Sequence, residues 1–201
     1  MVAASAIVLA GGRSSRMGRP KAALDFGGVP LLKRIISELE RRFAEIVVVA
    51  APESEDSLQI DLPAIKVVRD ETAYQGPLDA LRRGLDAVSN EIAFACSCDL
   101  PLLDSDVAVA IVAMLADFDA AIPIVGEKPQ PLHAAYRKRC ASALAALAMR
   151  GESRLIAIAD AVNTRRISEN DLLVLDPQLH SFFNLNAPGD YRRALKIAGL
   201  A

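Results

Sequence analysis

The sequence has few of the features that mark membrane, secreted or nucleic-acid-binding proteins. Its longest apolar runs are too short to span a bilayer. It opens directly on a predicted strand, with no basic segment or cleavage site before it. A formal net charge of −2 over 201 residues gives no overall basic character. We therefore expect a cytoplasmic protein that has no signal peptide and binds neither membranes nor nucleic acid.

Cysteine is also scarce, and its pattern does not suggest a disulfide framework. Three cysteines are an odd number, which suits a reducing compartment. Cys96 and Cys98 flank Ser97 on a predicted strand, a spacing that could suggest a metal, but no further cluster of cysteine and histidine accompanies them. We therefore interpret these two residues as buried thiols that act as small hydrophobes.

Apolar residues make up 52% of the chain and alternate between strand-like and helix-like patterns. Strands are predicted at residues 4–9, 45–50, 65–68, 92–97 and 120–124, and helices at 30–43, 77–88 and 106–116, the last capped by Asp104. This alternation predicts an α/β fold with an open, mostly parallel sheet and helices on both faces. Because no linker, repeat or low-complexity segment is found, we expect residues 1–201 to form one domain.

The last third of the chain is less regular. The predicted strands there are 132–136, 162–167, 172–175 and 182–183. Residues 137–149 are predicted to form an alanine-rich helix, followed by a short helix that ends at residue 159. The turn at residues 184–190 is expected to start the final helix.

A glycine-rich, cationic loop with the sequence LAGGRSSRMGRPK follows the first predicted strand, at residues 9–21. Its three glycines let main-chain N–H groups turn inward, and three arginines and a lysine surround them. Such a concave row of N–H groups with cations around it predicts an anion site, and phosphate is the usual anion. The loop lacks the Gly-Lys-Ser/Thr of a P-loop and the glycine spacing of a dinucleotide-binding loop.

The pattern Leu-x-Gly-Gly-x-x-x-Arg-Met-Gly-x-x-Lys resembles the signature loop of nucleotidyltransferases with the glycosyltransferase-A-like fold. Among these the chain is most similar to the molybdenum-cofactor guanylyltransferases, and the resemblance extends over nearly its whole length. It implies a Rossmann-like domain of the nucleotide-diphospho-sugar transferase type. It also implies Mg²⁺-dependent transfer of GMP from GTP to molybdenum-bound molybdopterin, with transient contacts to other cofactor-biosynthesis proteins or apoenzymes.

Two acidic residues are expected to meet the glycine-rich loop, because Asp70 and Asp99 each follow a predicted strand. Ligands of open α/β sheets bind beyond the carboxyl ends of the strands. Arg16 and Lys21 are the candidates for a phosphate clamp, assisted by Arg13. Asp99 is the candidate carboxylate for Mg²⁺, although its position alone also suits a turn aspartate that caps local N–H groups.

The resemblance adds roles to several positions. Cys98-Asp99-Leu100-Pro101 is similar to the family's Cys-Asp-x-Pro segment, whose Asp binds the metal. The residues it implies for nucleotide binding are Leu9, Ala10, Gly11, Gly12, Arg13, Lys21, Asp70, Gly76 and Asp99. Each of these positions also has a purely structural interpretation, such as a solvated loop or, at Pro77 beside Gly76, a helix opener.

The acceptor side is assigned by the same resemblance. Residues 184–190 are similar to the family's Asn-x-Asn-x-Pro-x-Asp/Glu turn, which implies acceptor contacts for Asn184 and Asn186 and a metal contact through the carbonyl oxygen of Asn186. Arg154 would bind the acceptor's phosphate. A helix cap and a surface arginine are the alternative interpretations.

Three positions depart from the family's pattern. Asp79 stands where Gly or Ala is common, Ala50-Ala51-Pro52 follows the second strand in place of an Asn, and Gln130-Pro131 replaces His-Pro. These departures leave CTP, or a sugar- or polyol-phosphate acceptor, as alternatives. A non-catalytic nucleotide-binding protein is a further alternative, but a protein that only binds needs no metal carboxylate such as Asp99.

Overall fold

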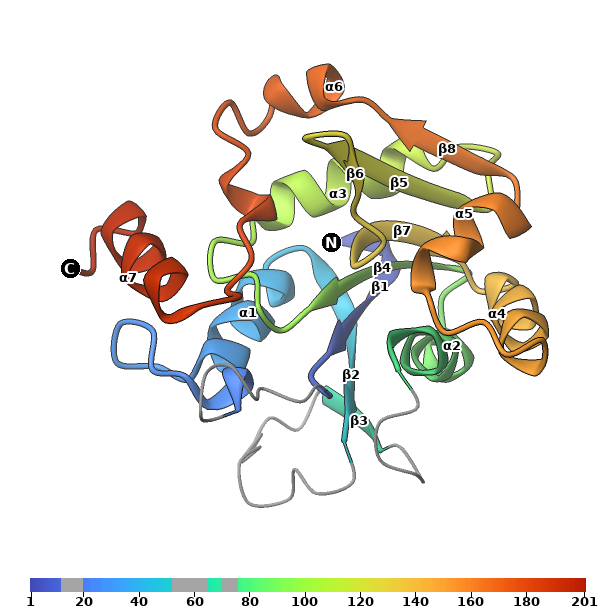
Figure 1. Cartoon of the computed structure of the whole chain (residues 1–201), viewed down its shortest axis with the longest axis horizontal. Coiled ribbons are helices and arrows are strands. Elements are labelled where there is room, and N and C mark those ends of the chain that lie inside the picture. Colours follow the sequence, from blue (N-terminus) through green and yellow to red (C-terminus); the bar gives the residue numbers. More distant parts are fainter. Residues whose placement is uncertain (12–19, 52–64, 70–75) are drawn as a thin grey trace.

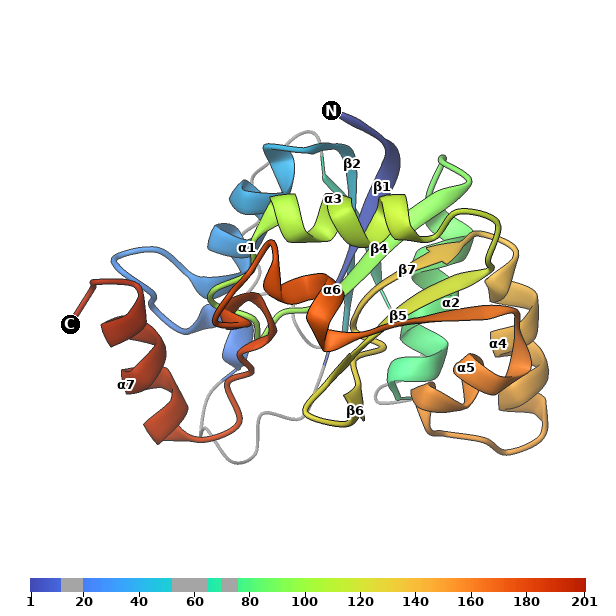
Figure 2. The ribbon, with the colours of Figure 1, turned by 90° about the horizontal axis from the view of Figure 1, so that it is seen from above.

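The computed structural model describes residues 1–11, 20–51, 65–69 and 76–201 (Figure 1). Within these ranges a central sheet is covered by helices on both faces, as Figures 1 and 2 show from two directions. The open, mostly parallel α/β architecture predicted from the sequence is confirmed. No helix of the described ranges is long and apolar enough to cross a membrane.

The sheet contains both parallel and antiparallel pairs. Its order is β3-β2-β1-β4-β7-β5-β6, and β8 pairs with β5. The strands are β1 (Val2–Leu9), β2 (Phe43–Ala50), β3 (Ile65–Arg69), β4 (Ile92–Ser97), β5 (Ala120–Val125), β6 (Lys128–Pro129), β7 (His133–Arg137) and β8 (Thr164–Ile167). β1 to β4 run parallel, whereas β7 is antiparallel to both β4 and β5. The carboxyl ends of the first four strands therefore share one edge of the sheet.

The helices are distributed over both faces of the sheet. They are α1 (Leu31–Glu40), α2 (Pro77–Ala87), α3 (Ser105–Met114), α4 (Cys140–Met149), α5 (Ile158–Ala161), α6 (Glu169–Leu173) and α7 (Pro188–Ile197). Short 3₁₀ helices lie at Lys21–Ala23, Leu155–Ala157 and His180–Phe182. One hydrophobic core contains residues of α1, α3, α6 and α7, and the other contains residues of α2, α4 and α5.

Both faces of the central strands are buried, which explains their uninterrupted apolar sequences. Along β1, Ala6 and Val8 point into the first core, and Ile7 and Leu9 point into the second. At the start of α3, Asp104 accepts a hydrogen bond from Asp106 N, so the predicted cap is confirmed.

Two predicted strands are wrong. The first of them, at 172–175, includes the end of α6. The second, at 182–183, includes the last residue of the 3₁₀ helix His180–Phe182. Side chains just before these segments cap short helices: Ser168 forms a capping box with Asp171, and the Asp176 carboxylate accepts hydrogen bonds from two following backbone N–H groups. The predicted helix at 30–43 also ends earlier, and Phe43 instead starts β2.

The cysteines are free thiols. Cys96 and Cys140 are buried, and Cys98 is half-buried. Burial, reinforced by the nearby Asp99 carboxylate, raises the pKa of Cys98 to about 12, so its thiol stays neutral. In the described part of the chain, no group of three or more His, Cys, Asp or Glu side chains is placed to hold a metal ion.

His133 is a polar residue inside the first core. It lies opposite Cys96 in the β4–β7 ladder, and its side chain is 1% exposed. Its ring stacks on Phe182, with centroids 4.2 Å apart, and meets the edge of Phe94 at 5.3 Å. Burial lowers the pKa of His133 from 6.5 to about 3, so the imidazole is neutral at ordinary pH.

We expect Gly84→Ala to destabilise the fold. A Cβ at Gly84 would lie 2.6 Å from Ile7 Cγ2 and 3.3 Å from Val49 Cγ2, because α2 rests closely on β1 and β2. Overpacking costs about 1–3 kcal/mol, which outweighs the gain of about 1 kcal/mol in helix propensity. Urea denaturation checks this, with Gly189→Ala in α7 as the control, because a Cβ there would have none of the described residues within 4 Å apart from its chain neighbours and its own helix backbone. Equal stability changes in the two variants would contradict this account.

His133 is expected to make stability depend on pH. In the unfolded chain it takes up a proton as the pH falls through 6.5, whereas the folded protein resists protonation down to about 3. The free energy of unfolding should therefore fall with decreasing pH in this window, by about 1.4 kcal/mol per pH unit from this group. Urea midpoints at several pH values check this. In His133→Phe, the free energy of unfolding should change less with pH, by the same amount per pH unit. A pH dependence identical to that of the unaltered protein would refute the assignment of this effect to His133.

Candidate active site

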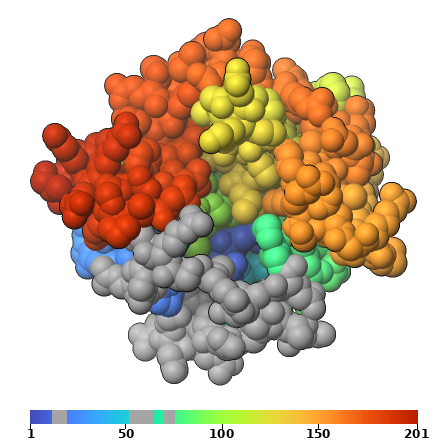
Figure 3. Space-filling view, in the orientation of Figure 1, coloured from blue at the N-terminus to red at the C-terminus, as the bar shows by residue number. Residues whose placement is uncertain are grey.

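The carboxyl ends of β1, β2 and β4 are aligned. Leu9 lies opposite both Val49 and Ser97. The backbone pairing continues one residue further, because Ala10 N donates to Val49 O at 2.8 Å and Cys98 N donates to Leu9 O at 3.0 Å. In the space-filling view, the blue atoms of the N-terminal strand lie recessed between the yellow segment before β7 and the start of α2 (Figure 3). The predicted meeting at one edge is thus present for the segments that follow β1 and β4, whereas Asp70 lies outside the described residues.

Lys21 and Asp99 form an ion pair at this edge. Lys21 Nζ lies 2.8 Å from Asp99 Oδ2, and the two side chains are 20% and 19% exposed. Lys21 starts a 3₁₀ helix in which Ala22 is buried, and this fixes the end of the glycine-rich loop. The contact joins segments 78 residues apart in the sequence, and it brings the expected cation and carboxylate together.

A second partner holds the other carboxylate oxygen. Ser97, the last residue of β4, donates a hydrogen bond from Oγ to Asp99 Oδ1. The carboxylate therefore has one oxygen on a hydroxyl and the other on an ammonium group. Sequence reasoning missed Ser97, and the only signal was a hydroxyl at the strand end two residues before the acid.

Part of the predicted site lies outside the described residues. Gly12, Arg13, Arg16 and Asp70 belong to this part, so their roles stay predictions. Gly11 is described, and a Cβ there would lie 3.1 Å from Ala51 N. Glycine at that position therefore allows the loop to leave β1 directly beside the end of β2.

The start of α2 contains Asp79, the acid that departs from the family's pattern. Gly76 has a φ of 93°, a conformation that favours glycine, and Pro77 opens the helix. Asp79 then binds Arg82 Nε at 2.9 Å and Arg83 Nε at 2.8 Å. Burial would raise the pKa of Asp79, but the hydrogen bonds from the two arginines outweigh it and hold this pKa below its usual value. The acid is thus neutralised by its own helix.

The turn at 184–186 reaches the Asp99 backbone. Leu185 N donates to Asp99 O at 2.9 Å. Asn184 and Asn186 are the sequence neighbours of Leu185, so their backbones lie next to this contact. Asn184 Nδ2 donates to Phe182 O at 3.1 Å. Asp190 closes the turn, because its carboxylate accepts from the backbone N–H of Asn186 at 2.9 Å.

Arg154 lies on the surface in a loop after α4. Its side chain is 76% exposed, and NH2 lies 2.9 Å from Glu152 Oε2. Hydrogen bonding by Arg154 lowers the pKa of Glu152 to about 2. Among the contacts of the described residues, none joins Arg154 to Lys21 or Asp99, so the structure does not bring it into the cluster.

A mostly parallel α/β sheet with a glycine-rich, cationic sequence after β1 and a carboxylate after β4 is typical of enzymes of the nucleotidyltransferase class. The family profile described as "MobA-like NTP transferase domain" matches residues 6–166. The chain therefore belongs to the MobA-like NTP transferase family.

Similar proteins cover the chain almost completely. A probable molybdenum cofactor guanylyltransferase of Pelotomaculum thermopropionicum is 31% identical, over 98% of this chain and 95% of its own. Molybdopterin-guanine dinucleotide biosynthesis protein A from Archaeoglobus fulgidus has a similar structure, with a TM-score of 0.85 at 24% identity over 98% of this chain and 100% of its own. The Rv0371c protein of Mycobacterium tuberculosis, solved with manganese, gives a TM-score of 0.65 at 14% identity over 96% and 97% of the chains.

The Lys21–Asp99 pair should contribute to stability. In a double-mutant cycle of Lys21→Met and Asp99→Asn, we expect a coupling of about 1 kcal/mol in the free energy of unfolding, because both groups are largely shielded from water. Urea denaturation of the four proteins measures it. The more exposed pair Arg42–Asp106 is the control and should give a smaller coupling. A coupling no larger than in this control would show that the contact does not persist in solution.

Proposed function

We propose that the chain transfers GMP from GTP to the phosphate of molybdenum-bound molybdopterin, giving the guanine dinucleotide cofactor and pyrophosphate. The observation that carries this proposal is the Lys21–Asp99 contact at the carboxyl ends of β1 and β4. Support for the substrates comes from the relative described as a probable molybdenum cofactor guanylyltransferase, which matches 98% of the chain.

The main work of the protein in such a reaction is electrostatic. The reacting phosphates must be held in line and their charge neutralised, while the acceptor supplies the nucleophile. Lys21 provides an ammonium charge at the site, and Arg16 and Arg13 are the proposed guanidinium partners. The backbone N–H groups of Gly11 and Gly12 are proposed to bind the phosphates, because Ala10 N already donates to Val49 O in the sheet.

Asp99 fits the role of a metal ligand. Its carboxylate oxygens are hard donors of the kind that Mg²⁺ prefers, and Ser97 fixes one of them. When bound, the ion would neutralise the negative charge of the phosphates and the charge that develops during transfer. A protein of similar fold was solved with manganese, and we propose that this chain also binds a divalent ion. Asn186 is the proposed second ligand, through its side-chain carbonyl.

The Lys21–Asp99 contact also links the proposed phosphate-binding role of Lys21 to the proposed metal-binding role of Asp99. Oδ2 is held by the ammonium group in the structure. A cation that binds this oxygen would compete with the ammonium group, which would then be available to pair with the triphosphate. We therefore expect the divalent ion and the nucleotide to bind more tightly together than either does alone.

The remaining proposed binding residues are those that the family resemblance implies for the nucleoside and the acceptor. Asp70 and Gly76 are proposed to bind the nucleoside, and Asn184, Asn186 and Arg154 the acceptor. We propose that the 201 residues act as one cytoplasmic domain, and that the product passes to other cofactor-biosynthesis proteins or apoenzymes through transient contacts.

The test is Mg²⁺-dependent pyrophosphate release with GTP and molybdenum-bound molybdopterin. Asp99→Asn should lower kcat by about 100-fold, because it removes transition-state charge stabilisation, while nucleotide affinity measured without Mg²⁺ changes little. Asp106→Asn is the control, since this exposed acid pairs with Arg42 away from the site and should leave turnover unchanged.

The outcomes separate the alternatives. Pyrophosphate release with CTP but not GTP would reject the guanine assignment and keep the reaction class. Turnover only with a sugar- or polyol-phosphate would reject the acceptor. Nucleotide binding without turnover in the unaltered protein would reject catalysis and support a binding protein.

A further inference from the structure

A buried histidine connects the sheet to the C-terminal segment. His133 Nε2 lies 3.2 Å from Ser181 Oγ, and the imidazole stacks on the next residue, Phe182, at an angle of 30°. Ser181 and Phe182 are both buried. Two consecutive residues of the segment are therefore held by one side chain of β7.

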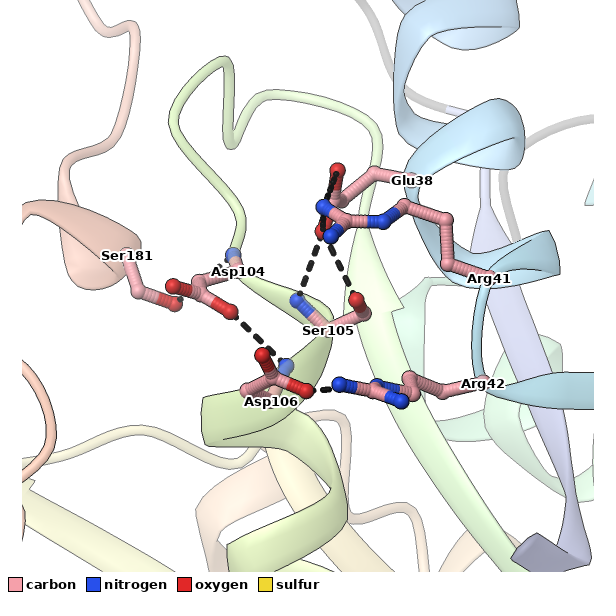
Figure 4. Close-up of polar contacts among 7 residues, drawn as sticks. All are labelled: Glu38, Arg41, Arg42, Asp104, Ser105, Asp106 and Ser181. Carbon is pink, nitrogen blue, oxygen red and sulfur yellow. Dashed lines mark hydrogen bonds and ion pairs between the residues drawn. The ribbon is translucent and has the colours of Figure 1, made fainter. Parts of the chain in front are cut away.

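Ser181 also contacts the loop that follows Asp99. Asp104 N donates to Ser181 Oγ at 3.3 Å, and Figure 4 shows the two residues side by side. On the far side of this loop, Ser105 donates to Glu38 Oε1 from both N and Oγ, at 3.1 and 2.7 Å. The loop is thus held between α1 and the C-terminal segment (Figure 4).

The same segment continues to the Asp99 backbone. Leu185 is fully buried, and its N–H donates to Asp99 O at 2.9 Å. Only two residues separate Phe182 from Leu185, so the position of Phe182 strongly limits where Leu185 N can lie. A shift of the His133 ring would therefore be transmitted to the residue that carries the carboxylate.

The second imidazole nitrogen, Nδ1, shows which contact of His133 a phenylalanine could not replace. Nδ1 is buried and has no hydrogen-bond partner in the described structure. An unpaired buried polar atom lowers stability. A phenylalanine would keep the ring contacts and avoid this cost, so the specific contribution of histidine is its bond to Ser181.

We propose that His133 is a positioning residue for nucleotidyl transfer. It fixes Ser181 and Phe182, and through them it holds Leu185 N on the Asp99 carbonyl, so that the carboxylate stays aligned with Lys21. His133 itself does not touch the reacting groups. The catalytic part of this inference rests on the proposed function, whereas the structural coupling can be tested without substrate.

The first measurement is amide hydrogen exchange in the substrate-free protein, followed by NMR. In His133→Phe and Ser181→Ala, exchange at Leu185 should become about tenfold faster relative to exchange at Val48 in β2, which responds to global opening. Ser5→Ala is the matched control. Ser5 is fully buried and bonds Glu45 and Asn90 at the opposite end of β1. Its variant should leave the Leu185-to-Val48 ratio unchanged.

The second measurement is steady-state turnover with GTP, Mg²⁺ and molybdenum-bound molybdopterin. Misplacing Asp99 should lower kcat by about tenfold with little change in the KM for GTP, because the loss falls on the transition state. His133→Gln can still bond Ser181 and should recover part of kcat. Ser5→Ala should have the kcat of the unaltered protein.

The outcomes are distinct. An unchanged Leu185 ratio in both His133→Phe and Ser181→Ala would overturn the coupling, and if the first variant does not fold, the second decides alone. Faster exchange with unchanged kcat would overturn the catalytic role. No turnover in the unaltered protein would reject the proposed function and this catalytic role with it, while the exchange ratios would still decide the coupling.

Discussion

The site depends on the parallel register of β1 with its two neighbours. Leu9 lies opposite Val49 on one side and Ser97 on the other, so three chain segments leave the sheet at the same level. The glycine-rich loop and the Asp99 turn therefore start within one hydrogen bond of each other, as the Cys98–Leu9 backbone contact shows. This pairing starts the two segments side by side, and the cation and the carboxylate meet at the same edge of the sheet.

The charges at this edge are balanced in small, separate groups. Asp99 is shared between Lys21 and Ser97, and Asp79 is neutralised by two arginines of its own helix. Partly buried charges are costly unless they are paired and hydrogen-bonded. A negatively charged ligand that binds here must therefore compete with these carboxylates for the cations that neutralise them.

Local patterns predicted most of the fold, and long-range contacts account for what they missed. β4 has its predicted bounds, and the Asp104 cap is present, because both follow from neighbouring residues. Leu172 and Phe182 are buried but lie in short helices, since side-chain caps outweighed their strand-like pattern. The bond between Ser181 and His133 spans 48 residues and leaves no signature in either segment. For Arg13, Arg16 and Asp70, the sequence remains the basis of the assignment.

The antiparallel strand β7 affects the breadth of the sheet edge that carries the site. It separates β4 from β5 by two inter-strand spacings, about 10 Å, while both of these strands still run in the same direction. The carboxyl ends of β4 and β5 therefore lie at the same edge of the sheet, with one strand between them. The proposed reaction requires such a broad edge, because donor and acceptor must bind side by side for the acceptor phosphate to attack.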